Sequence, residues 1–200
     1  MAEMDSALST PLEPIVPTFP VKRFTADQYI EMIRAGILTT EDKVELIDGV
    51  ITPMAPAGEE HTWEVVFLNR LFRSVWDTHF LFVQGTIPIN SVNVFDPDFV
   101  LVRQGEAEQQ LRYPHADEID LIVEVAKSSL KQDQTRKAAA YSQAGIPEYW
   151  IANIPAKSLI VHREPSPSGY QSIRTFGINE TVTPLAFSDM SVRVGDIFGV

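Results

Sequence analysis

LIVEVAKSSLKQDQTRKAAAY, residues 121–141, places one acidic side chain inside an otherwise apolar run. Residues 121–126 are apolar except for Glu124, which is the composition of a strand buried on both faces of a sheet. An isolated carboxylate in such a strand is costly unless it is paired, hydrogen-bonded or bound to a cation. We therefore interpret Glu124 as part of a polar site.

A polar break and a helical stretch follow this strand. After Ser128 and Ser129, the side chains of Asp133, Lys137 and Tyr141 recur every four residues, which is the spacing of one helix face. Strand, break and helix together predict one wall of a polar site. Asp133 and Lys137 also suit an ordinary ion pair on a helix, worth about 0.3–0.5 kcal/mol. At this point Lys137 can belong either to the polar site or to that ion pair.

The length and composition bound the class of protein. The chain has 200 residues, of which 44% are hydrophobic and 22% charged, as expected for a globular protein with one domain. The Pro-rich residues 1–20 predict a flexible lead-in, and residues 21–200 predict the domain. No apolar run approaches the roughly 18–20 residues that span a membrane. The N-terminus lacks the pattern of a secretory signal, and the absence of cysteine excludes disulfides and fits a cytoplasmic location.

The net charge of −11 argues against a large electrostatic contact with nucleic acid. A locally basic cleft can still coexist with an acidic surface. Basic side chains do gather at Lys127, Lys131, Arg136 and Lys137, although a solvated helix face explains that cluster equally well.

Periodicity and turn signals predict the remaining elements. A capping box at Thr25 and Gln28 begins a helix over residues 26–35, and Asp48-Gly49 predicts a hairpin that pairs residues 44–47 with 50–54. Further predictions are a core helix over 60–78, one or two strands within 80–89, a strand entered at Asp98, a mobile connecting loop over 103–118, a buried strand over 148–154, a hairpin of 159–162 with 170–176, and an apolar tail packed at the edge.

Three acids lie at or in predicted strands, namely Glu45, Asp98 and Glu124. Carboxylates that converge in space bind a hard cation such as Mg²⁺, which can activate water and neutralise the charge of a phosphate. Two carboxylates can instead perform general acid and base chemistry, as in glycosidases. His61, in the first turn of the predicted core helix, either faces the site or ends a helix without a role.

Several segments, in this order, resemble the Uma-type family of restriction endonucleases within the PD-(D/E)XK nuclease superfamily. They are ELIDGVI (45–51), EEH (59–61), PDFVLV (97–102), IVEVAKSS (122–129), the Asp133, Lys137 and Tyr141 spacing, and AGIPEYWI (144–151). The resemblance extends over residues 24–200. It implies a restriction-endonuclease-like α/β core, with a mixed central sheet flanked by helices.

The resemblance also implies an activity and a site. The expected activity is metal-dependent endonucleolytic hydrolysis of DNA, with Mg²⁺ or Mn²⁺ as the cofactor. Carried across, Asp98 and Glu124 are metal ligands, the backbone carbonyl of Val125 is a third ligand, and Glu45 holds a second metal or shapes the first site. Because one active site per chain cuts one strand, a homodimer is expected for double-strand cleavage. The apolar tail at 197–200 suits an interface or packing within the chain.

The sequence departs from the superfamily pattern at the catalytic lysine. The lysine of the superfamily lies two residues after the strand acid, where this chain has Ala126. Lys127 is turned to the other face by the alternation of the strand. Lys137 on the following helix is the better candidate, and Gln134 is a further one. A missing lysine also fits a second hypothesis, in which the fold binds nucleic acid or a partner without cleaving it.

Overall fold

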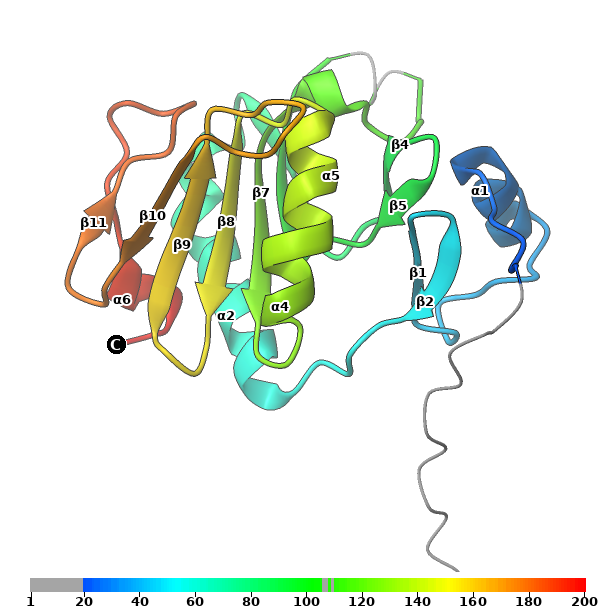
Figure 1. Ribbon diagram of the computed structural model, residues 1–200. Coiled ribbons are helices and arrows are strands. Elements are labelled where there is room, and N and C mark those ends of the chain that lie inside the picture. The colour runs from blue at the N-terminus through cyan, green and yellow to red at the C-terminus, as the bar shows by residue number, and fades with distance from the viewer. Residues whose placement is uncertain (1–19, 106–107, 109) are drawn as a thin grey trace, which may run out of the picture.

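The computed structural model describes residues 20–105, 108 and 110–200. Within these residues the chain forms a six-stranded mixed sheet with helices on both faces, beside a smaller antiparallel sheet (Figure 1). The predicted mixed α/β fold is confirmed. The predicted lead-in lies outside the described residues except for residue 20, as do residues 106, 107 and 109 of the predicted loop.

The large sheet has the strand order β10-β9-β8-β7-β6-β3. Only β7 and β8 run parallel, and every other neighbouring pair is antiparallel. A parallel pair needs a crossover, which the helical segment 130–143 supplies. The strands are β3 (His79–Phe82), β6 (Phe99–Arg103), β7 (Ile119–Ala126), β8 (Glu148–Asn153), β9 (Ser158–Arg163) and β10 (Ser172–Phe176).

Helices cover both faces of this sheet, so β7 is buried on each side as predicted. On one face, Val123 and Val125 share a core with α2 (Glu59–Leu71) and α6 (Val194–Ile197). On the other face, Ile122 and Ala126 pack with the crossover helix, which consists of α4 (Leu130–Gln132), η3 (Asp133–Lys137) and α5 (Ala138–Gln143). In Figure 1 the crossover helix lies in front of β7 and α2 lies behind it. The alternation of β7 therefore turns Glu124 toward the crossover helix.

The small sheet, with the order β2-β1-β5-β4, lies to the right of the large one in Figure 1, with α1 (Ala26–Arg34) packed beside it. The predicted capping box of α1 and the predicted hairpin of β1 (Val44–Ile47) with β2 (Val50–Pro53) are both confirmed. The region 80–89 contributes one strand to each sheet, β3 to the large one and β4 (Ile87–Asn90) to the small one. The strand β5 (Asn93–Phe95) was not predicted, because three residues are too few to show an alternation.

Two predictions need correction in detail. The core helix ends as an α-helix at Leu71 and continues as a 3₁₀ turn, η1 (Phe72–Val75), short of the predicted end at 78. The predicted loop 103–118 ends in another 3₁₀ turn, η2 (Ala116–Glu118). Both are short turns of the kind found at helix ends and in connections, where the hydrophobic period gives no signal.

The C-terminal tail packs into the chain's own core rather than only at its edge. It forms β11 (Thr181–Val182), β12 (Val192–Arg193) and α6. Ile197 and Phe198 are buried in the core shared with α2, whereas Val200 is 61% exposed. Packing within the chain thus accounts for Ile197 and Phe198, but not for Val200, among the apolar side chains that had suggested an interface. Across the described residues, no helix is both long enough and apolar enough to cross a membrane.

Candidate active site

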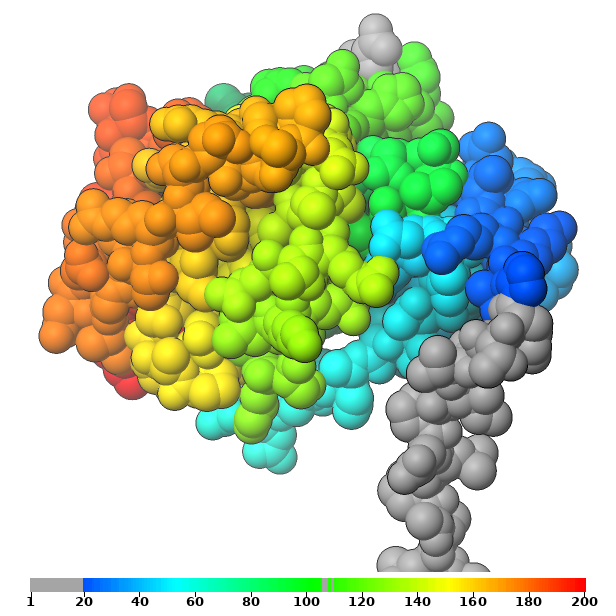
Figure 2. All heavy atoms as spheres, viewed as in Figure 1, coloured from blue at the N-terminus to red at the C-terminus, as the bar shows by residue number. Residues whose placement is uncertain are grey.

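The predicted site residues surround one cavity of about 240 Å³. It lies where β1 of the small sheet faces the start of β6, the end of β7, the first turn of α2 and the crossover helix. Figure 2 shows an opening in this region, between the cyan chain that joins β2 to α2 and the yellow-green start of the crossover helix. The functional side chains in its wall are Glu45, His61, Asp98, Glu124, Asp133 and Lys137, together with Val125.

Asp98 is held at the entrance of β6 by two contacts. Its Oδ2 accepts a hydrogen bond of 2.8 Å from the backbone N–H of Val125, because the antiparallel pairing of β6 with β7 brings the start of one to the end of the other. Its Oδ1 lies 2.9 Å from Nε2 of His61, which therefore faces the site. The hydrogen bond to Asp98 is the largest cause of the raised pKa of His61. Asp98 is thus fixed from both sides.

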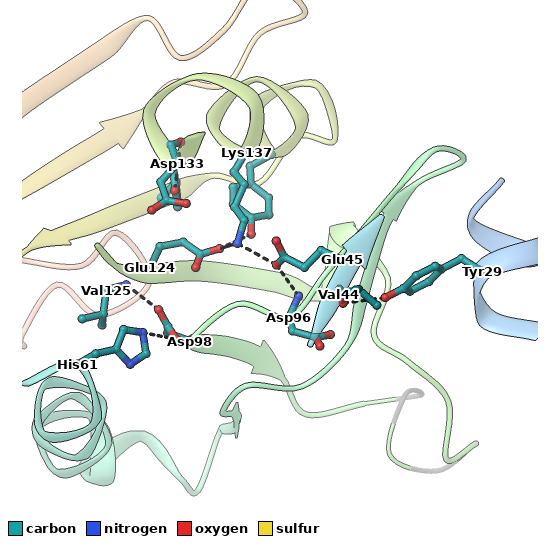
Figure 3. A network of polar contacts seen from close by, with 12 residues as sticks. Tyr29, Val44, Glu45, His61, Asp96, Asp98, Glu124, Val125, Asp133 and Lys137 are labelled. Carbon is teal, nitrogen blue, oxygen red and sulfur yellow. Dashed lines mark hydrogen bonds and ion pairs between the residues drawn. The ribbon is translucent and has the colours of Figure 1, made fainter. Parts of the chain in front are cut away.

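Glu124 projects from β7 into contacts with the crossover helix, as Figure 3 shows. Its Oε1 accepts hydrogen bonds from the hydroxyl of Tyr141 at 2.8 Å and from Nζ of Lys137 at 2.9 Å. Burial raises the pKa of Glu124 well above its usual value, and the charge of Lys137 acts in the opposite direction. The suspicion that a carboxylate in this strand needs partners is therefore correct.

Lys137 lies between two carboxylates in Figure 3. Its Nζ is 2.9 Å from Oε1 of both Glu45 and Glu124, and 5.4 Å from the centre of the Phe95 ring. Burial alone would lower the pKa of this lysine, but the charges of Glu124 and Glu45 outweigh burial and raise it. Lys137 therefore stays an ammonium ion, suited to stabilise negative charge and unsuited to accept a proton.

Asp133 lines the site, in the wall that the sequence predicted, but the sequence did not single it out as a catalytic or metal-binding residue. The alternative prediction of an ion pair between Asp133 and Lys137 is wrong, because Lys137 binds Glu45 and Glu124 instead. Both residues belong to η3, a π-helical turn, and both are buried against the cavity. Such turns occur frequently at functional sites. The four-residue spacing did place Asp133 on the buried helix face, but the same spacing fits a surface pair.

The carboxylate of Asp133 is in an unfavourable environment. Only 1% of the residue is exposed, and among the described residues neither oxygen accepts a hydrogen bond of full geometry. Burial raises its pKa from 3.8 to about 6, although Lys137 and the nearby hydroxyl of Ser129 both act to lower it. An ionised, unpaired carboxylate that lines a cavity is a natural ligand for a cation.

We predict that Asp133→Asn stabilises the metal-free protein above pH 6. Because the pKa of Asp133 is higher in the folded than in the unfolded chain, the folded state holds more protons between pH 3.8 and 6, and its stability falls as pH rises through that range. Asn cannot ionise, so the variant escapes this loss, which is at most about 3 kcal/mol for a shift of roughly two units. Urea unfolding in EDTA from pH 4 to 7.5 measures the difference.

The control is Asp189→Asn, which removes an exposed carboxylate. Its free energy of unfolding should stay close to that of the wild type, as for most substitutions of exposed residues. A difference between Asp133→Asn and the wild type that stays constant from pH 4 to 7.5 would show that Asp133 carries no such strain.

Glu45 reaches the site from the small sheet. It is 3% exposed, and its Oε1 accepts hydrogen bonds from Nζ of Lys137 and from the backbone N–H of Asp96 at 3.0 Å. Its observed contacts position the lysine. A role for Glu45 in holding a second metal stays a prediction.

The other candidates for the missing lysine are exposed side chains, although Lys127 also lines the cavity. The ammonium of Lys127 is exposed and pairs with Glu60 at 2.7 Å, which fits the predicted turn to the other face. Gln134 is exposed on the crossover helix. Arg136 pairs with Asp48 at 2.7 Å. The predicted basic cluster is therefore divided between one buried lysine and exposed cations, two of which are paired with acids.

The donor set suits Mg²⁺ or Mn²⁺ if the substrate completes the coordination. Asp98 and Glu124 offer the carboxylate oxygens that these ions prefer. As the side chains stand, no three acids or histidines among the described residues converge closely enough to hold a metal by themselves. Mg²⁺, however, is usually held by one or two carboxylates with waters and substrate phosphates. Two carboxylates at the rim of a cavity therefore fit this ion.

The restriction-endonuclease-like fold is shared with one solved structure. A crystal structure of a "putative nuclease belonging to DUF820" from Anabaena variabilis matches with a TM-score of 0.67 at 17% identity, over 88% of this chain and 97% of that one. The type IIG restriction endonuclease BpuSI gives a TM-score of 0.41 at 17% identity, over 69% of this chain and 15% of that one. Curated proteins give no match.

The chain belongs to the Uma2 family, described as "Putative restriction endonuclease", whose profile matches residues 26–195. The family that the sequence segments had suggested is thereby confirmed.

Proposed function

We propose that this protein is a metal-dependent endonuclease that hydrolyses phosphodiester bonds of DNA in the cytoplasm. The observation that carries the proposal is the position of Lys137, whose ammonium lies between Glu45 and Glu124 at the cavity that Asp98 also lines. An acid at each of two neighbouring strand ends, with a permanent cation beside them, suits the hydrolysis of a phosphate diester. The family description supports the same reaction class.

In this proposal Asp98 and Glu124 hold Mg²⁺ or Mn²⁺, with the carbonyl of Val125 as a third ligand. A metal held there would polarise the phosphate and lower the pKa of a water molecule. His61 and the N–H of Val125 orient Asp98, and Tyr141 orients Glu124.

Lys137 faces the reacting phosphate and stabilises the negative charge that develops on its oxygens. Its position does not depend on substrate, because Glu45 and Glu124 hold it in place. The N–H of Asp96 fixes Glu45 in turn. Lys137 thus takes the place of the lysine that the superfamily carries where this chain has Ala126.

The charges of the cavity predict that metal is required for binding as well as for catalysis. Five acids line it, namely Glu45, Asp96, Asp98, Glu124 and Asp133, and Lys137 is its only buried lysine among the described residues. A phosphate that approaches this excess of negative charge is repelled until a cation neutralises it. We expect EDTA to abolish cleavage and to weaken DNA binding by tenfold or more, roughly the effect of one unscreened charge pair.

The test is cleavage of labelled single-stranded and duplex DNA by the purified protein with Mg²⁺, Mn²⁺ or EDTA. Hydrolysis in EDTA, or metal-independent hydrolysis of a glycoside, would contradict the proposal and favour acid and base chemistry by the carboxylates. Metal-dependent DNA binding without turnover on either substrate would contradict it in favour of a binding module.

Cleavage of both strands of a duplex would need two copies of the site, so a homodimer remains part of the proposal for duplex substrates. Light scattering of the protein with and without duplex DNA tests this part. A mass of one chain under both conditions, together with double-strand cleavage, would exclude the homodimer.

A further inference from the structure

A second, larger cavity of about 510 Å³ adjoins the site. The two cavities share the segment 54–57 and the residues Asp96 and Asp98 in their walls. In Figure 3, Asp96 lies between the acids of the site and Tyr29, which belongs to the second cavity. A group bound in the larger cavity would therefore lie next to a phosphate at Asp98.

The second cavity has an apolar wall and a polar rim. Tyr29, Ile33, Leu38 and Met54 supply the apolar wall. The ring of Tyr29 is fixed, because its hydroxyl donates a 2.8 Å hydrogen bond to the carbonyl of Val44. Thr40, Lys43 and Gln84 are among the polar residues that line the cavity, and all three are exposed.

Two residues of the polar rim have a strained backbone. Lys43 and Gln84 have φ angles of 49° and 51°, in the left-handed region that residues other than glycine rarely adopt. The N–H of Gln84 donates to the carbonyls of Pro97 and Asp98, at 3.1 and 3.3 Å, and the carbonyl of Lys43 accepts from the N–H of Met54 at 2.8 Å. These bonds tie the strained residues to the segments that both cavities share. Strain of this kind gathers at sites of function.

The side chains of these two residues are available to a ligand. Within the described ranges, neither the ammonium of Lys43 nor the amide of Gln84 makes a hydrogen bond or a close ion pair with another side chain. An amide beside an apolar wall can form hydrogen bonds with the edge of a base that stacks on that wall. A lysine at the same rim can contact the next phosphate of the strand.

We propose that the second cavity binds one nucleoside of a DNA strand whose neighbouring phosphate lies at Asp98, so that the substrate is single-stranded DNA. This inference rests on the proposed function and specifies its substrate. The cavity has the size of a site for a small organic group. A base can enter it only after leaving the duplex stack, which costs least in an unpaired strand.

The charges of the protein favour the same substrate. Duplex binding depends on many cations that contact phosphates along both strands. The net charge here is −11, and the exposed Lys127 and Arg136 near the site are already paired with Glu60 and Asp48. A single strand held by one buried nucleoside and one metal-bound phosphate needs far fewer cations.

The experiment fills the cavity with a tryptophan at its exposed rim. Thr40→Trp changes an exposed residue of a turn and leaves the core intact, and Leu185→Trp, at an exposed position on the C-terminal part of the chain, is the matched control. The probes are a labelled single-stranded oligothymidylate of eight nucleotides and a duplex of the same length. Binding is measured with Ca²⁺, cleavage with Mg²⁺, and occupation of the acid site by calorimetric titration with Mn²⁺.

We expect the wild type to bind and cleave the single strand at least about tenfold better than the duplex, and Thr40→Trp to lose about tenfold in single-strand affinity, the effect of losing one stacked base. Mn²⁺ affinity should stay unchanged in Thr40→Trp, and Leu185→Trp should match the wild type throughout. Gln84→Ala, which tests the polar rim without filling the cavity, should weaken single-strand binding several-fold.

The outcomes separate this inference from the proposed function. If Thr40→Trp binds and cleaves the single strand as the wild type does, or if the wild type prefers the duplex, the nucleoside site is wrong and the nuclease stands. If the wild type binds the single strand without cutting it, and Thr40→Trp loses that binding, the nucleoside site is supported and the hydrolytic function fails.

Discussion

Asp98→Asn should lose about 10³-fold or more in the rate of DNA cleavage while keeping its fold. The proposed metal ligand becomes a neutral amide, and stabilisation by a metal amounts to several kcal/mol, with each 1.36 kcal/mol worth a factor of ten in rate. Asn has nearly the same shape, and its carbonyl can still accept the hydrogen bond from Val125. Single-turnover cleavage in Mg²⁺ measures the rate, and calorimetric titration with Mn²⁺ measures the accompanying loss of affinity.

The chain contains a closely matched control. Asp120 also contacts a histidine, with Oδ2 2.9 Å from Nε2 of His79, and its side chain is 14% exposed against 11% for Asp98. It lies outside the cavity. Asp120→Asn should therefore cleave DNA at the wild-type rate, whatever its effect on stability. Equal activity of the two variants would show that Asp98 is a structural partner of its histidine and nothing more.

Lys137→Met should lose about 10²–10³-fold in the cleavage rate, the usual effect of removing one electrostatic contact to a transition state. It should also destabilise the protein by about 3–5 kcal/mol, because Glu45 and Glu124 lose a buried counter-ion. A loss of activity alone would thus be ambiguous. Single-turnover rates and urea unfolding are therefore compared across a double-mutant cycle.

The second change in the cycle is Glu45→Gln. With one carboxylate neutralised, Lys137→Met should cost much less stability in the double variant than in the wild-type background. Activity should not return, because the positive charge is still absent. Lys137→Arg, which keeps the charge, should retain more activity than Lys137→Met at every pH. If the double variant regains both stability and activity, the lysine only balances the charge of the acids.

The sequence predicted the parts of the site that depend on local pattern. A charge within the apolar run 121–126 is visible without a structure, and the cost of burying it correctly predicts that Glu124 has partners. Asp48-Gly49 and the capping box at Thr25 are short-range signals, and both elements formed as expected. The order of motifs predicted the family and the fold.

The sequence could not predict the contacts between segments far apart in the chain. Glu45 and Lys137 are 92 residues apart, and their ion pair depends on a second sheet whose strand β5 is too short to recognise. The role of Asp133 depends on a π-helical turn, and the i, i+4 spacing favours a helix ion pair instead. The contact of His61 with Asp98 depends on how α2 packs against the large sheet.

The central claim is that Asp98 and Glu124 together hold a divalent cation beside Lys137. The most direct measurement is a crystal structure of the protein soaked in Mn²⁺, with the ion located by its anomalous scattering. We predict one ion in the cavity of about 240 Å³, with oxygens of both carboxylates about 2–2.3 Å from it. Crystals without an ion at these two residues, or with Mn²⁺ bound only elsewhere, would contradict the account.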